Sequence, residues 1–128
     1  MTLRTTARLA VLASALGVLL HLYTAAFKAS GGISFFLLGL LSWSCVPYVI
    51  TALLARRPNA SLLSLGAACL CLVVDGYMHY SVFVAPKSST AAVGLLFAPL
   101  WNLLLVGPLG AAGFWLAGRA FARTQNAP

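Results

Sequence analysis

Apolar residues are grouped into four long runs that are separated by short polar stretches. The runs cover residues 7–27, 33–55, 61–84 and 91–118. A helix needs roughly 20 residues, at about 1.5 Å each, to cross about 30 Å of hydrocarbon, and each run is long enough. Short connections favour antiparallel neighbours. The pattern therefore predicts an all-α integral membrane protein, an antiparallel four-helix bundle with up-down topology, as one transmembrane domain over residues 1–128.

The composition agrees with a protein whose solvent is lipid. Hydrophobic residues make up 62% of the chain and charged residues 7%, whereas soluble domains carry about 25% charged residues. The net charge of +7 could suggest nucleic acid, but the basic residues stand at the ends of the apolar runs. There they favour the anionic head groups of the lipid bilayer, so we expect no nucleic-acid partner.

The positions of the basic residues predict the orientation of the chain. Six of them lie before the first run, between the second and third runs, and after the fourth: Arg4, Arg8, Arg56, Arg57, Arg119 and Arg123. Only Lys28 and Lys87 lie in the other two connections. Because basic residues concentrate on the cytoplasmic side of a membrane, both termini are predicted to be cytoplasmic (N-in/C-in).

The only acidic residue of the chain, Asp75, lies near the middle of the third run. A carboxyl group at this depth costs several kcal/mol unless it is protonated, paired or hydrated, so it is a candidate functional group. Cys71, Asp75 and His79 are each four residues apart and therefore share one helix face. The third helix is thus predicted to carry a polar stripe on an otherwise apolar surface.

Polar residues of the other runs are predicted to lie at a similar depth. Asp75 and His21 both lie roughly 21 Å from the predicted cytoplasmic boundary, at about 1.5 Å per residue. All four runs contribute to this predicted intramembrane cluster, whose members are Asp75, His79, His21, Asn102, Ser42 and Ser44. Its two interpretations are a proton carrier and a set of hydrogen bonds that joins the helices.

Prolines and glycines predict the shapes and contacts of the helices. Pro47, Pro99 and Pro108 lie inside apolar runs and are predicted to kink the helices, because proline lacks a backbone N–H. Gly17 in the first run and Gly113 in the fourth are predicted to lie where neighbouring helices approach closely. The first and fourth helices are therefore expected to present small-residue faces to other helices.

The chain lacks the residues of a known catalytic set. One aspartate and two histidines, without an external domain, complete neither a nucleophilic triad nor a metal-hydrolase site. We therefore expect a non-enzymatic protein and assign no catalytic residue and no metal site. No cofactor is predicted, although haem held between His21 and His79 is a less favoured alternative.

One segment resembles a known group of proteins. Residues 86–110, PKSSTAAVGLLFAPLWNLLLVGPLG, are similar to a segment in a group of small, uncharacterised bacterial inner-membrane proteins of about this length. The resemblance implies a four-span build and a location in the cell inner membrane. It implies no catalytic residue.

Two functions are favoured by these patterns. The first is a non-enzymatic auxiliary or assembly subunit of a larger membrane complex, because the chain is small and has small-residue faces for a membrane-protein partner or a second copy. The alternative is a small proton-linked transporter or channel that uses Asp75 as carrier and His79 as relay.

Overall fold

The computed structural model describes residues 3–28, 34–85 and 91–125, which are almost entirely helical. The first half of the chain contains α1 (Leu3–Phe27) and α2 (Phe35–Ala55). A short 3-10 turn, η1 (Pro58–Ala60), leads into α3 (Ser61–Phe83). The last part consists of α4 (Ala91–Trp101), a π-helical segment η2 (Asn102–Val106) and α5 (Gly107–Gln125), which follow one another without a break.

Within the described residues, four helical stretches are long and apolar enough to cross a membrane: Leu3–Phe27, Phe35–Ala55, Pro58–Phe83 and Val93–Thr124. This confirms the all-α membrane fold class. The helices extend beyond the apolar runs at both ends of the chain, since α1 begins at Leu3 and α5 continues to Gln125. An apolar run marks the part of a helix inside the hydrocarbon, and polar residues can continue the same helix outside it.

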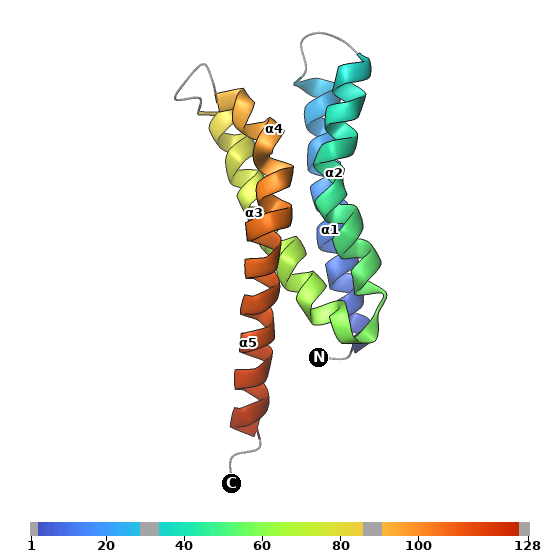
Figure 1. Ribbon diagram of the computed structural model, residues 1–128, viewed down its shortest axis with the longest axis vertical. Helices are drawn as coiled ribbons and strands as arrows, with labels where there is room; N and C mark the ends of the chain where they lie inside the picture. The colour runs from blue at the N-terminus through green and yellow to red at the C-terminus, as the bar shows by residue number, and fades with distance from the viewer. Residues whose placement is uncertain (1–2, 29–33, 86–90, 126–128) are drawn as a thin grey trace.

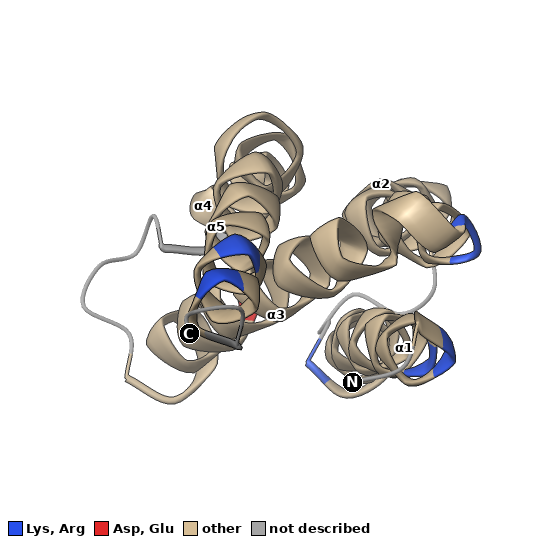
Figure 2. Cartoon of the chain, turned by 90° about the horizontal axis from the view of Figure 1, so that it is seen from below, with Lys and Arg blue, Asp and Glu red and all other residues tan. Residues whose placement is uncertain are grey.

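Successive spans run antiparallel, with α4, η2 and α5 forming one continuous span, and α3 is the central element (Figure 1). The contacts of α1 are made mainly to α2 and α3, and those of α5 mainly to α3. Seen along the long axis, α4 and α5 lie on one side of α3, and α1 and α2 on the other (Figure 2). α3 therefore holds the bundle together, because the α1–α2 pair packs on one side of it and the α4–α5 span on the other.

Glycines mark the closest approaches between helices. A Cβ atom on Gly66 of α3 would overlap the carbonyl oxygen of Gly110 of α5, and one on Gly110 would overlap that of Gly66. A Cβ atom on Gly17 of α1 would overlap the ring of Tyr48 of α2. The predicted close approach at Gly17 is therefore confirmed, because only a residue without a side chain fits there.

The predicted close approach at Gly113 is wrong. Gly113 is exposed, and a Cβ atom there would meet nothing within 4 Å. The face of α5 toward α3 carries Gly110, Phe114 and Gly118, which contact Gly66 and Leu62. Successive residues of an α-helix are about 100° apart, so Gly113 points away from this face although its neighbour Phe114 lies on it.

The prolines have different consequences in the two helical segments that contain them. Pro47 lies inside α2, which remains a single α-helix from Phe35 to Ala55. In the fourth span, the π-helical segment η2 lies between Pro99 and Pro108, and the backbone N–H of Gly107 donates to the carbonyl of Asn102 five residues earlier. The interruption predicted for this span is therefore a π-helical turn. Kinks at the three prolines remain a prediction.

Candidate functional site

The carboxyl group of Asp75 lies at the centre of a hydrogen-bonded group, which we call the Asp75 cluster: His21, Tyr48, Asp75, His79 and Asn102. Asp75 is 1% exposed. Its Oδ2 accepts a hydrogen bond from the Tyr48 hydroxyl at 2.6 Å and lies 3.1 Å from Nε2 of His21. Its Oδ1 accepts a hydrogen bond from Nδ2 of Asn102 at 2.8 Å. The carboxyl group of this α3 residue is thus hydrogen-bonded to residues of α1, α2 and η2.

His21 and Tyr48 reach this carboxyl group because α1 and α2 pack closely just beside it. The buried face of α1 includes Ser14, Gly17 and His21 at spacings of three and four residues, which places them on one side of the helix. Gly17 leaves the space that the Tyr48 ring fills. One turn away, the hydroxyl groups of Ser14 and Thr51 are 2.9 Å apart, which holds the same two helices together.

The π-helical segment η2 positions Asn102. Asn102 is the first residue of this segment, and its carbonyl accepts the N–H of Gly107. The Sγ atom of Cys71 on α3 lies 3.8 Å from the same carbonyl oxygen. Single π-helical turns are frequent at functional sites, where they change the direction of one side chain. Here the side chain concerned is the one that donates to Asp75.

His79 contacts the backbone of the cluster and its second imidazole. Its Nδ1 lies 2.7 Å from the carbonyl oxygen of Asp75. Because a carbonyl oxygen only accepts, Nδ1 carries the hydrogen, and Nε2 of a neutral His79 is then an acceptor. The ring also packs edge to face against His21, with 5.1 Å between ring centroids. The cluster therefore contains two imidazoles in contact beside one carboxyl group.

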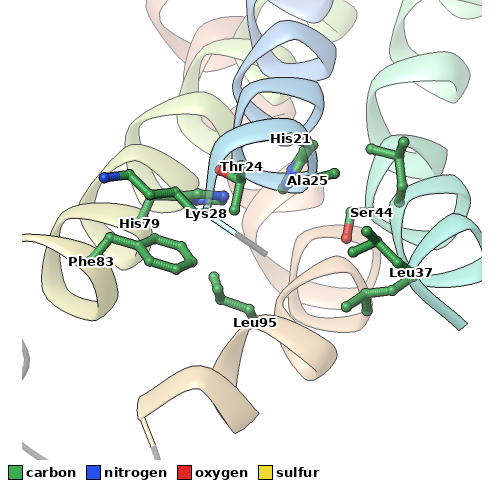
Figure 3. Close-up of a pocket in the computed structure, with 11 residues that line it drawn as sticks. His21, Thr24, Ala25, Lys28, Leu37, Ser44, His79, Phe83 and Leu95 are labelled. Carbon is green, nitrogen blue, oxygen red and sulfur yellow. The ribbon is translucent and has the colours of Figure 1, made fainter. Parts of the chain in front are cut away.

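Two grooves reach the cluster from opposite directions. The upper groove, as oriented in Figure 1, has a volume of about 210 Å³ and is lined by residues that include Lys28, His21, His79 and Ser44. Figure 3 shows side chains of α1, α2 and α3 around this groove, with Leu95 of α4 also on its wall. The two imidazoles of the cluster therefore form part of the wall of this groove.

The lower groove lies between α2, α3 and the η2–α5 segment. It has a volume of about 370 Å³ and extends from Asn102 and Cys71 of the cluster region to Ala60 before α3, past Thr51 and Ser64. Within the described residues, Oδ1 of Asn102 is the buried side-chain oxygen or nitrogen atom without a hydrogen-bond partner. Water entering from this groove would supply the donor that such a buried acceptor needs.

The structure brings together four of the six residues predicted for the intramembrane cluster: Asp75, His79, His21 and Asn102. Ser44 is buried and lines the upper groove. Ser42 is exposed on the surface of α2, so its placement in the cluster is corrected. Residues two apart on a helix point in directions about 200° apart, so Ser42 and Ser44 cannot both face the interior.

Tyr48 was missing from the predicted cluster, although it is the largest fully buried side chain in the described part of the chain. A signal for it exists in the sequence. Ser44, Tyr48, Thr51 and Ala55 are spaced by four, three and four residues, and all four are buried. This spacing identifies one face of a helix. The polar residues on it indicate that this face of α2 is directed toward the other helices.

The arrangement of the two histidines does not fit a haem. A haem with two histidine ligands needs the iron and the porphyrin plane between the two imidazoles. The rings of His21 and His79 are instead in edge-to-face contact, and Nε2 of His21 is bonded to Asp75. The geometry of His21 and His79 therefore does not support the alternative of a haem held between them. Among the described residues, no group of three or more His, Cys, Asp or Glu side chains is placed to hold a metal ion.

Comparisons with models of protein families, with curated proteins and with solved structures found no match. The fold and the site therefore define the class of this protein on their own. It is an all-α integral membrane protein of four apolar helices. Its distinguishing feature is a buried carboxyl group that is hydrogen-bonded to the other three spans.

Proposed function

We propose that this protein is a small proton-linked transporter or channel in which Asp75 carries the proton. The observation that carries the proposal is the position of the Asp75 cluster between two grooves. His21 and His79 of the cluster line the upper groove, and Asn102 lines the lower groove. A titratable group inside a membrane with access from both directions is the arrangement that a proton pathway requires.

The imidazoles supply the upper part of the proposed pathway. An imidazole can accept a proton at one ring nitrogen and release one from the other. His21 lines the upper groove and is hydrogen-bonded to the carboxyl group of Asp75 through Nε2. His79 lines the same groove and contacts His21. A proton that enters from the upper groove therefore reaches Asp75 through His21, with His79 as a second acceptor beside it.

Protonation of Asp75 changes the bonds that hold the helices together, which links proton binding to structure. Hydrogen bonds to an ionised carboxylate are about twice as strong as those between neutral groups. The bonds from Tyr48, His21 and Asn102 join three other spans to α3. We therefore propose that protonation weakens all three attachments at once and lets the helices on either side of α3 shift.

Proton movement through reconstituted liposomes tests this proposal. With a potassium gradient and valinomycin as the driving force, we expect the parent protein to acidify or alkalise the lumen faster than protein-free liposomes. Asp75→Asn should reduce this rate to the protein-free level, because a side-chain amide does not bind and release a proton near neutral pH. Ser42→Ala is the matched control on the exposed face of α2 and should conduct as the parent does. Equal rates for the parent and Asp75→Asn would contradict the proposal.

We also propose that both termini are cytoplasmic and that the membrane is a bacterial inner membrane. The orientation is supported by the six basic residues beside the termini and the η1 turn, and the location by the resemblance of residues 86–110. In a variant without native cysteines, Asn59→Cys should react with a membrane-impermeant maleimide only after the cells are broken. Ser34→Cys should react in intact spheroplasts. The reverse pattern of labelling would show the opposite orientation.

An auxiliary or assembly subunit is the second candidate function. It is favoured by the fact that the Asp75 cluster bonds all four spans to each other, which is also what a purely structural role requires. Large apolar side chains such as Phe121 and Leu116 of α5 are exposed and available to lipid or to a membrane-protein partner. On this alternative, the parent protein moves no protons and is extracted by mild detergent within a larger complex.

A further inference from the structure

Three arginines lie around a groove at the lower end of α1 and α2, far from the Asp75 cluster. Two adjoining hollows there share Ala7 of α1 and both Ala55 and Arg56 at the end of α2. One of them is also lined by Arg4, and the other by Arg8. We call this surface the arginine groove. Figure 2, seen from this end, shows basic residues of α1 and of the end of α2 on the same side of the molecule.

The positive charge of the arginine groove has no acidic side chain to balance it. Asp75 is the only acidic residue of the whole chain, and it is buried beside His21. Asp75 is 14 residues into α3 from Ser61, which corresponds to about 21 Å along the helix. An acidic side chain of this protein therefore cannot pair with Arg4, Arg8 and Arg56, so an anion that binds them comes from another molecule.

The positions of Arg4 and Arg8 on α1 also favour the binding of an anion. Arg4 and Arg8 are four residues apart and so are neighbours on the helix surface, where like charges repel. Arg4 also lies in the first turn of α1, where the partial positive charge of the helix N-terminus disfavours a cation. An anion between Arg4, Arg8 and Arg56 would offset both effects.

The walls of the arginine groove indicate which anion this is. Toward the middle of the molecule the hollow beside Arg8 is lined by Val11 and Leu12, and both side chains are exposed. The groove therefore continues from a basic end onto an apolar surface of a membrane span. A phosphate on a hydrocarbon chain matches this sequence of surfaces, whereas free phosphate would use only the basic end.

We propose that the arginine groove is a binding site for one anionic phospholipid. Its phosphate lies between Arg4, Arg8 and Arg56, and an acyl chain follows α1 along Val11 and Leu12. Basic pockets between membrane spans are known as a mode of binding anionic lipid head groups. The site is independent of the proposed proton pathway, because it shares no residue with the Asp75 cluster or with the two grooves that reach it.

Native mass spectrometry of the purified protein with equal amounts of phosphatidylglycerol and phosphatidylcholine tests the site. The parent is expected to retain one phosphatidylglycerol selectively. The double variant Arg8→Gln with Arg56→Gln should weaken this binding about 25-fold, at about fivefold for each basic residue near a head group. The matched control, Arg119→Gln with Arg123→Gln, removes the same charge from α5 at the same end of the molecule (Figure 1) and should change binding less than fivefold.

A second measurement does not depend on removing charges. In the Leu12→Trp variant, phosphatidylglycerol with brominated acyl chains should quench the added fluorescence more than brominated phosphatidylcholine at the same concentration, after subtraction of the parent signal. Equal quenching by the two lipids would overturn the proposal. So would equal loss of phosphatidylglycerol in the two double variants, since that would show a response to net charge alone.

Discussion

Replacement of Asp75 by leucine is expected to lower the free energy of unfolding by roughly 2–5 kcal/mol. The substitution leaves the buried donors of Tyr48 and Asn102 without their acceptor and Nε2 of His21 without its hydrogen-bond partner. Each unsatisfied buried donor costs about 1–3 kcal/mol. In membrane proteins the sum is smaller, because the unfolded chain also finds other partners within the lipid. Thermal unfolding in a neutral detergent, followed by circular dichroism, measures the effect.

Asp75→Asn is the matched control for this stability experiment. Asparagine has nearly the same shape, and its side-chain oxygen can still accept from Tyr48 or Asn102, so a loss of no more than about 1–2 kcal/mol is expected. The comparison separates the structural contribution of the carboxyl group from its proton chemistry. If Asp75→Leu unfolds at the same temperature as the parent, the cluster does not stabilise the fold.

Gly66→Ala is expected to be strongly destabilising although it adds a single methyl group. The added Cβ atom would overlap the carbonyl oxygen of Gly110 and lie 2.7 Å from the Cβ atom of Phe114. Backbone atoms cannot move aside as a flexible side chain can, so α3 and α5 would have to separate where they cross. Overpacking of this kind costs about 1–3 kcal/mol or more. A lower unfolding temperature in detergent is the expected result.

Gly113→Ala is the matched control, and its effect should have the opposite sign. Gly113 lies three residues after Gly110 on the same helix, but a Cβ atom there would meet nothing within 4 Å. Alanine favours the helix over glycine by up to about 1 kcal/mol, so stability should stay the same or rise slightly. Similar losses for both variants would mean that the loss in Gly66→Ala does not come from the crossing of α3 and α5.

The sequence predicted the positions of site residues correctly where they depend on spacing and depth along a single helix. The spacing of four residues placed Asp75 and His79 on one face of α3, and the small-residue stripe of α1 placed His21 on its buried face. Depth along each helix followed from the rise per residue. For this reason His21, Asp75 and Asn102 were predicted to lie in one layer, and the structure shows hydrogen bonds between them.

The prediction of which residues are buried failed where burial depends on how one helix is rotated relative to its neighbours. Ser42 and Gly113 were assigned to the interior by residue type and depth, yet both are exposed. Tyr48 was omitted, because tyrosines of membrane spans are also common at the membrane–water interface, where they mark no site. The depth of a residue does not determine which side of its helix meets a neighbour. That depends on the contacts made by the neighbouring helices.

The sequence by itself determined the class of the fold, because crossing a bilayer imposes a length and an apolar composition that can be counted residue by residue. It also identified the carboxyl group that needs an explanation, since the chain has only one. Only the tertiary structure decided which groups satisfy Asp75, which glycines allow close approach, and that two grooves reach the cluster. These features depend on how helices rotate and cross, and that is fixed by contacts between residues far apart in the chain.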